Sequence, residues 1–175
     1  QQAVKEARPL VILSRGNILV VDDEVNLCRI LDAKLTKSGY QVVTVHDGLQ
    51  AVEKVQERQF DLVLLDLMLP KLDGLEALEK IRKINAELPV IIMTAYGNTD
   101  AVTRARSQGA AAFVSKPFNL DRLVMLVQNT SSEGRSISSE TTVMDGSGIF
   151  RKNQILTIEA PEQGGGERDR LGAEH

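Results

Sequence analysis

Short apolar runs alternate with amphipathic stretches from Asn17 to about Thr130. Most of these runs are apolar at consecutive positions, which is typical of strands covered by helices on both faces of a parallel sheet. Strands are predicted at residues 18–21, 42–45, 62–65, 90–93 and 111–114.

The stretches between the runs have apolar residues at helical spacing. The markers of the five helices are Leu27, Ile30, Leu31 and Leu35; Val52 and Val55; Leu75, Leu78 and Ile81; Ala101, Val102 and Ala105; and Leu120, Leu123, Val124 and Val127. Gly39 and Gly109 follow two of the helices as C-cap signals, and Asn119 is the predicted N-cap of the last helix. Five successive β-α units imply a doubly wound α/β domain with a parallel sheet, right-handed crossovers and helices on both faces.

The ends of the chain have a different composition. Residues 1–16 precede the first unit and form an N-terminal extension. Residues 131–142 are rich in Ser, Thr and Glu, which predicts a linker. Beyond it, residues 141–144, 149–150 and 155–158 could form short strands, with a turn at 145–148 that would make a β-hairpin. The segment 131–175 is therefore predicted to be a Ser-rich linker and an acidic tail, too small to hold a core of its own.

Composition excludes several classes of partner. Aromatic residues make up 3% of the chain and Trp is absent, which argues against a stacking platform for single-stranded nucleic acid. The formal net charge is −3, and the tail is itself acidic, so direct nucleic-acid binding is not expected. No segment approaches the roughly 20 apolar residues of a membrane span. The one cysteine, Cys28, cannot form an internal disulfide, and a reduced, cytoplasmic setting fits.

Polar residues follow four of the predicted strands. Asp22 and Asp23 come after the first strand, Asp66 after the third, Thr94 after the fourth and Lys116 after the fifth. Ligands bind at the carboxyl ends of strands in open α/β sheets, and these four strands are neighbours in the flavodoxin-like order 2-1-3-4-5. The five side chains are therefore expected to meet in one crevice.

The residue types predict phosphoryl chemistry in that crevice. Three neighbouring carboxylates repel one another and stay ionised together only around a cation. Oxygen ligands in an open site suit Mg²⁺, which also bridges to phosphate oxygens. A carboxylate can attack phosphorus to give an acyl phosphate, while Lys116 and Thr94 contact the transferred group.

Five motifs in this order resemble the receiver domain of bacterial two-component response regulators. They are Val20-Val21-Asp22-Asp23-Glu24, Leu65-Asp66-Leu67-Met68-Leu69-Pro70, Asp73-Gly74, Met93-Thr94-Ala95 and Lys116-Pro117-Phe118. The resemblance covers residues 17–130. The strand order 2-1-3-4-5 is itself a property of this family, so it adds no independent support.

The resemblance assigns a role to each matching position. Asp66 would be the phosphoacceptor, and Mg²⁺ would be held by Asp22, Asp23, Asp66 and the backbone carbonyl of Met68. Thr94 and Lys116 would bind the phosphoryl group, and the bond between Lys116 and Pro117 is expected to be cis. Thr94 and Phe113 would form the switch. Phe113 has no hydroxyl, unlike the Tyr variant, so only burial of its ring could serve that role.

The resemblance also predicts the partners. The phosphoryl group would come from a histidine kinase or a histidine phosphotransfer protein, and phosphorylation would alter a protein-interaction surface around the fourth helix, fifth strand and fifth helix. A phosphorylation-dependent dimer is one form this output could take. Such a domain catalyses only its own phosphorylation and dephosphorylation and is not otherwise an enzyme. Bulky Met68 and Tyr96 border the expected path of the hydrolytic water, which predicts a long-lived phosphoryl group.

Several alternatives stay open to different degrees. An Asp-nucleophile phosphatase of the haloacid dehalogenase class needs a second Asp where Met68 stands, and a nucleotide-binding protein needs a glycine-rich phosphate loop that is missing after the first strand. A receiver-shaped module that takes no phosphate would need an occluded site. A stand-alone receiver acting by protein contact or phosphorelay is favoured. A fragment of a larger regulator or hybrid kinase is the alternative, which the start at Gln1 rather than Met keeps open.

Overall fold

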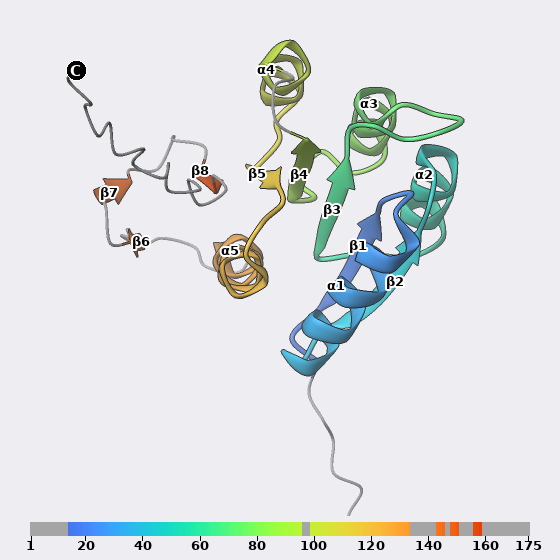
Figure 1. The fold of residues 1–175 in the computed structure, drawn as a ribbon. Coiled ribbons are helices and arrows are strands. Elements are labelled where there is room, and N and C mark those ends of the chain that lie inside the picture. The colour runs from blue at the N-terminus through green and yellow to red at the C-terminus, as the bar shows by residue number, and fades with distance from the viewer. Residues whose placement is uncertain (1–13, 96–98, 134–142, 146–147, 151–155, 159–175) are drawn as a thin grey trace, which may run out of the picture.

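The chain folds around one parallel sheet. The computed structural model describes residues 14–95, 99–133, 143–145, 148–150 and 156–158. Five strands lie in the order β2-β1-β3-β4-β5, and a sixth, β8, is added beside β5 (Figure 1). Their bounds are Asn17–Val21 for β1, Gln41–Val45 for β2, Leu62–Asp66 for β3, Val90–Ala95 for β4, Ala112–Lys116 for β5 and Leu156–Ile158 for β8. The predicted doubly wound fold and its strand order are confirmed.

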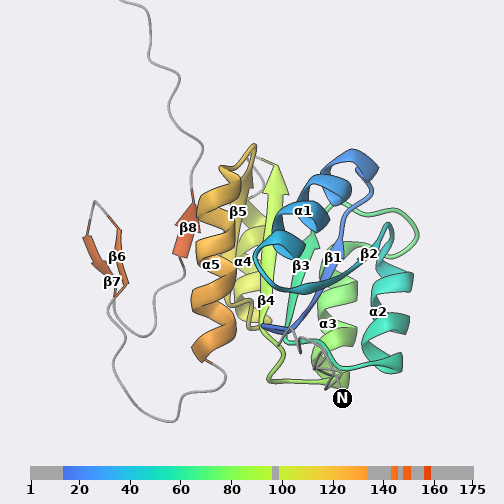
Figure 2. The ribbon, with the colours of Figure 1, turned by 90° about the horizontal axis from the view of Figure 1, so that it is seen from below.

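The helices form a layer on each face of the sheet. Helices α1 (Val25–Lys37) and α5 (Leu120–Glu133) lie on one face, and α2 (Gly48–Glu57), α3 (Gly74–Ile84) and α4 (Thr99–Ser107) lie on the other (Figures 1 and 2). All neighbouring strands of this sheet are parallel. Every strand therefore ends at the same edge, which is where the polar residues that follow the strands collect.

Two largely aliphatic clusters fill the space between the sheet and its helix layers. Alternate strand residues serve opposite faces, so Ile18 and Val20 belong to the cluster under α1 and α5, whereas Leu19 and Val21 belong to the other. Burial on both faces explains why the strands are apolar at consecutive positions. One predicted core residue differs, because Ile30 of α1 is 50% exposed.

Capping residues mark the start of α5 and the ends of α1 and α4, as the sequence indicates. Asn119 Oδ1 accepts hydrogen bonds from the amides of Asp121 (2.9 Å) and Arg122 (3.1 Å), as an N-cap does. Gly39 and Gly109 follow α1 and α4 with φ angles of 97° and 80°, in the left-handed region that favours glycine.

The C-terminal part differs from the predicted linker at its start. Helix α5 continues to Glu133, three residues past the predicted boundary, and the Ser131 hydroxyl donates to the Val127 carbonyl at 2.8 Å. Strands β6 (Val143–Asp145) and β7 (Gly148–Phe150) pair antiparallel, as a hairpin would. Residues 1–13 of the predicted N-terminal extension and 134–142 of the predicted linker lie outside the described residues. Among the described helices, none has the length and apolar character needed to cross a bilayer.

Candidate functional site

The residues predicted to form the crevice lie together at the carboxyl edge of the sheet. Asp66 is the last residue of β3, Asp22 follows β1, Thr94 lies near the end of β4, and Lys116 ends β5. One carboxylate oxygen from each of Asp22, Asp23 and Asp66 lies within 4.8 Å of the others. The sheet register brings about this convergence, because β1 and β4 flank β3 and β5 pairs with β4.

Burial differs sharply among these groups. Asp22, Asp66 and Thr94 are 0%, 4% and 6% exposed, whereas Asp23 is exposed. Buried carboxylates are costly unless they are paired with positive charge or hydrogen-bond donors. The site therefore depends on compensating partners.

Lys116 supplies that compensation. Its Nζ atom lies 2.8 Å from Asp66 Oδ2, to which it donates a hydrogen bond, and 2.6 Å from Asp22 Oδ2. It also reaches the exposed Glu24 at 3.2 Å. Burial alone would lower the pKa of Lys116, but the hydrogen bond to Asp66 and the negative charges of Asp66 and Asp22 outweigh burial and raise the pKa. The lysine is therefore held as a cation between two carboxylates.

Asp22 is the most deeply buried of the acids. Its Oδ1 atom accepts a hydrogen bond from the Glu24 amide at 2.9 Å. Its Oδ2 atom faces Lys116 in an ion pair without hydrogen-bond geometry and has no hydrogen-bond donor among the described residues. Burial raises the pKa of Asp22, although Lys116 and the Glu24 amide act in the opposite direction. A carboxylate oxygen has two lone pairs, so Asp22 Oδ2 can contact a second cation besides Lys116.

The acid cluster fits a divalent metal ion. Its donor atoms are all oxygens, the set that Mg²⁺ prefers, and the undonated Oδ2 of Asp22 offers one coordination position. Asp22, Asp23 and Asp66 are the side chains that would hold it. Because Lys116 already contacts Asp22 and Asp66, an ion there would share or displace those contacts.

The loop between β3 and α3 holds Asp66 in place. Asp66 Oδ1 accepts a hydrogen bond from the Met68 amide at 2.9 Å. Gly74, the first residue of α3, packs so closely that a Cβ atom there would overlap the carbonyl oxygen of Asp66 and the backbone of Leu67. Met68 itself is 65% exposed. The loop therefore fixes the backbone of the acid while leaving the Met68 side chain at the surface.

A second contact ties this loop to α2. The buried side chain of Asp47 accepts a hydrogen bond from the Gln50 amide at 2.8 Å and forms a 2.9 Å ion pair with Lys71 of the loop. Lys71 has a φ of 64°, a conformation that is uncommon outside glycine. These contacts lower the pKa of Asp47, with the Gln50 hydrogen bond as the largest cause and Lys71 as the next.

The predicted switch residues are buried on adjacent strands. The Thr94 hydroxyl donates to the Ala95 carbonyl at 3.1 Å, and Phe113 is 2% exposed within the cluster under α2, α3 and α4. The peptide bond between Lys116 and Pro117 is cis, the isomer that the resemblance implied. Tyr96, the second residue predicted to border the water path, lies outside the described residues.

Three groups at the site were not assigned to it from the sequence. His46 is half-buried, and its Nδ1 lies 2.9 Å from the Asp22 carbonyl. Because a carbonyl only accepts, Nδ1 must carry the proton. Cys28 Sγ contacts the same carbonyl at 3.2 Å, and Glu24 reaches Lys116. The position of His46 directly after β2, the neighbour of β1, was an available signal.

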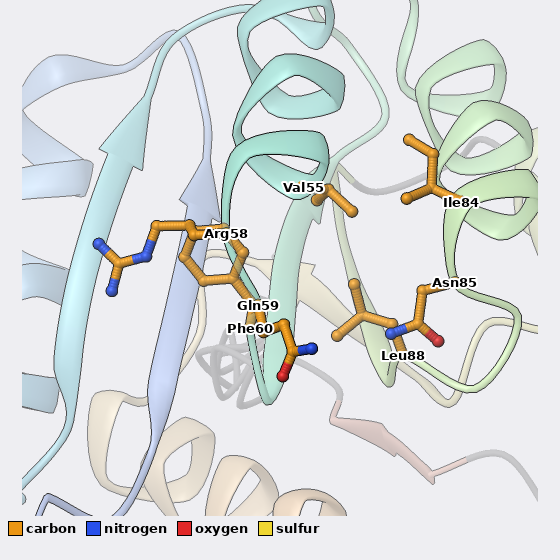
Figure 3. A pocket seen from close by; sticks show the side chains of 7 residues that line it. All are labelled: Val55, Arg58, Gln59, Phe60, Ile84, Asn85 and Leu88. Carbon is orange, nitrogen blue, oxygen red and sulfur yellow. The ribbon is translucent and has the colours of Figure 1, made fainter.

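A surface pocket lies at the opposite edge of the sheet. Its volume is about 240 Å³, and it lies between the C-terminal ends of α2 and α3 near the start of β3 (Figure 3). It is lined by Val55, Arg58, Gln59, Phe60, Ile84, Asn85 and Leu88. None of these residues carries a carboxylate, so the pocket is separate from the cluster of Asp22, Asp23 and Asp66.

Comparison with known proteins identifies the same region. The family model described as "Response regulator receiver domain" matches residues 18–128. The transcriptional regulatory protein ZraR of Klebsiella oxytoca is 41% identical over 126 residues, which is 72% of this chain and 28% of that protein. The sporulation initiation phosphotransferase F of Bacillus subtilis is 40% identical over 106 residues, which is 61% of this chain and 86% of that protein.

Solved structures agree with these relatives. NtrX from Brucella abortus, crystallised with ADP, has a TM-score of 0.66 at 34% identity over 70% of this chain and 28% of its own. The receiver domain of the same NtrX has a TM-score of 0.63 at 36% identity, over 66% of this chain and 98% of that domain. The chain thus spans less than a third of ZraR and of the NtrX chain crystallised with ADP, and it covers nearly the whole of the isolated NtrX receiver domain.

Proposed function

The chain belongs to the response regulator receiver family, and from that premise we propose that Asp66 accepts a phosphoryl group from a phosphorylated histidine. The observation that supports this most strongly is the environment of Asp66. Its carboxylate lies at the carboxyl end of the central strand, 4% exposed, with Lys116 at 2.8 Å and two further carboxylates close by. A carboxylate, a countercharge and an acid cluster that could hold a metal ion therefore converge on one point, which supports the proposed role of Asp66 as nucleophile.

The transfer is a displacement at phosphorus. One carboxylate oxygen of Asp66 forms a bond to phosphorus as the bond from phosphorus to the donor's imidazole nitrogen breaks. The imidazole keeps that electron pair and takes up a proton, and Asp66 becomes an acyl phosphate. Asp22, Asp23, Asp66 and the Met68 carbonyl would hold Mg²⁺, which would supply charge neutralisation for the phosphoryl oxygens.

Lys116 and Thr94 complete the binding of the phosphoryl group. Lys116 leaves its ion pair with the Asp66 carboxylate and pairs with a phosphoryl oxygen, which conserves its positive charge in the site. The Thr94 hydroxyl, now directed at the Ala95 carbonyl, turns to donate to another phosphoryl oxygen. Phe113 then adjusts its packing between β5 and α4, so that the chemistry at Asp66 alters the surface of α4, β5 and α5.

The output is proposed to be a protein contact. The donor would be a histidine kinase or a histidine phosphotransfer protein, and the reaction would take place in the cytoplasm. From Ser131 onward the chain has five Lys and Arg against eight Asp and Glu residues, a net charge of −3 that does not favour contact with nucleic acid. The match over 86% of a sporulation phosphotransferase supports a relay or contact role for residues 17–133, with 1–16 and 134–175 as extensions.

The proposal is tested by direct phosphorylation. The protein is incubated with Mg²⁺ and acetyl phosphate, and its intact mass is recorded beside that of Asp66→Asn, which keeps the shape of the side chain. One added phosphoryl group on the wild type alone, and only with Mg²⁺, is the expected result. If soluble, folded wild type gains no phosphoryl group from acetyl phosphate or from a phosphohistidine donor, the domain is a phosphorylation-silent interaction module.

A further inference from the structure

The outer edge of β5 is occupied by a segment from the far end of the chain. Strand β8, residues Leu156–Ile158, pairs parallel with β5 in the register Ala112 to Leu156, Phe113 to Thr157 and Val114 to Ile158. Both ribbon views show β8 on the side of β5 that faces away from β4 (Figures 1 and 2). The domain thus has a sixth strand that the five β-α units do not account for.

Without β8, the edge of β5 would be a ready template for another strand. Residues 112–114 are Ala, Phe and Val, and they carry none of the charges or prolines that blunt the edges of natural sheets. The Ala111 amide donates to the Val90 carbonyl of β4. Because successive amides of a strand point to opposite sides, those of Ala112 and Val114 point away from β4, toward β8. An extended segment can therefore bind through main-chain hydrogen bonds.

The connection to β8 has an unusual hand. Helices α1 and α5 lie on the same face of the sheet. The chain crosses the sheet in one direction when it passes from β1 through α1 to β2, and in the opposite direction when it passes from β5 through α5 to β8. The step from β5 by way of α5 to β8 therefore has the opposite hand to the four crossovers before it. Right-handed crossovers prevail in about 98% of parallel connections, so β8 has none of the usual topological support.

The length of β8 leads to the same conclusion. It offers only three residues, and β5 is the one strand of this sheet with which it pairs. A short strand paired along one side only, with no regular crossover, has few interactions that hold it to the rest of the fold.

We propose that the β5 edge is a docking site for an extended apolar segment, and that Leu156–Ile158 of the same chain is its removable occupant. The sequence Leu-Thr-Ile suits the role because its β-branched residues favour extended backbone. The site adjoins Ser115 and Lys116 on the same strand, so its occupancy alters the surface beside the phosphorylation site. The proposal does not depend on phosphorylation, because it concerns the unphosphorylated chain.

The test uses the full chain with one proline. Thr157→Pro removes a backbone donor from β8 and is poorly tolerated inside a strand pair. Ile149→Pro places the same change in β7, which pairs with β6 and not with β5. Amide hydrogen exchange is followed by NMR at Ala112 and Val114, with the Phe113 amide, directed to β4, as an internal control.

Exchange at Ala112 and Val114 should become at least about tenfold faster in Thr157→Pro and stay unchanged in Ile149→Pro, since only the first change frees the edge. A synthetic peptide covering Lys152–Ala160 should bind Thr157→Pro and restore the protection, while wild type should not bind it. Equal exchange in wild type and Thr157→Pro, or peptide binding to wild type, would overturn the proposal. Protection that rises with protein concentration would instead assign the occupant to a second copy and also overturn it.

Discussion

The ammonium group of Lys116 lies 2.6 Å from Asp22 Oδ2, although β3 and β4 separate β1, which Asp22 follows, from β5, which Lys116 ends. Asp22 is fully buried and its Oδ2 atom receives no hydrogen bond from the described residues. A metal ion that bound to Asp22 and Asp66 would therefore compete with the Lys116 ammonium for the same carboxylate oxygens. In the absence of metal, Lys116 is the charge that keeps Asp22 and Asp66 together.

This relationship predicts two opposite effects of Lys116→Met. The substitution removes the competitor, so Mg²⁺ should bind on the order of tenfold more tightly, a difference of about 1.4 kcal/mol. The metal-free protein should be less stable, because two buried carboxylates lose their counter-charge. Titration calorimetry with Mg²⁺ measures the first effect and urea unfolding without metal the second. Lys34→Met, in the exposed ion pair with Asp121, is the control and should change neither. Weaker Mg²⁺ binding by Lys116→Met would show that the lysine does not occupy the metal's place.

The lifetime of the phosphoryl group is expected to depend on Met68. The Met68 amide donates a hydrogen bond to the Asp66 carboxylate, and the Met68 side chain is 65% exposed. The side chain therefore lies close to the acid and can shield the phosphorus from water. Met68→Asn replaces an apolar thioether by an amide that can hold a water molecule, and the decay of phosphorylated protein should become several-fold faster. Stability should change little, since the side chain is at the surface. Decay is followed by intact mass after removal of the donor. Exposed Met125 of α5 offers a matched control, and Met125→Asn should leave the rate as it is.

Gly74 is predicted to be essential for the position of Asp66. A methyl group at this residue would overlap the Asp66 carbonyl oxygen and the Leu67 backbone, neither of which can move without shifting the acid. Gly74→Ala should therefore lower the free energy of unfolding by about 1–3 kcal/mol, against the usual preference of helices for alanine. Gln56→Ala, at an exposed position of α2, should leave stability nearly unchanged or slightly increased. Urea unfolding distinguishes the two, and a fully stable Gly74→Ala would contradict the close packing.

Asp47 should make stability depend on pH. Its pKa is lowered in the folded state, so its contribution is present above the unfolded value of about 3.9 and is lost as pH falls through the folded pKa. Asp47→Asn keeps an oxygen for the Gln50 amide but loses the charge that faces Lys71, and Asp47→Ala also loses the cap, which costs about 1 kcal/mol more.

At pH 7 the free energy of unfolding should therefore be highest for wild type, lower for Asp47→Asn and lowest for Asp47→Ala. The difference in free energy of unfolding between wild type and Asp47→Asn should disappear as the pH is lowered below 4, where Asp47 takes up a proton. A gap that stays constant at low pH would mean that the charge of Asp47 does not contribute.

The periodicity of the sequence was sufficient for the sheet and for the position of the site. Strands buried on both faces leave a clear signal, and the polar residues that end them mark one edge, so Asp22, Asp66, Thr94 and Lys116 could be placed together. Ile30 was misplaced because helical spacing identifies a broad apolar stripe and not the individual residues that reach the core. The three extra residues of α5 were missed because Ser and Thr indicate a linker, although their hydroxyls can also bond to carbonyls within a helix.

Long-range partners were beyond what a pattern can show. Residues 155–158 were expected to form a short strand, but nothing in them specifies that they pair with β5. The ion pair of Asp47 with Lys71 joins two loops, and the contact of His46 with the Asp22 carbonyl depends on how far β2 extends beside β1. Each of these contacts depends on tertiary geometry, which the local spacing of residues in the sequence does not determine.

The central claim is that Asp66, and no other residue, carries the phosphoryl group. Borohydride reduces an acyl phosphate to an alcohol, so a phosphorylated aspartate becomes homoserine at the site of modification. The protein is phosphorylated with acetyl phosphate and Mg²⁺, reduced, digested and mapped by mass spectrometry. The account predicts homoserine at residue 66 in wild type and none in Asp66→Asn. Homoserine at Asp22 or Asp23, or phosphate retained on a residue that borohydride does not reduce, would contradict it.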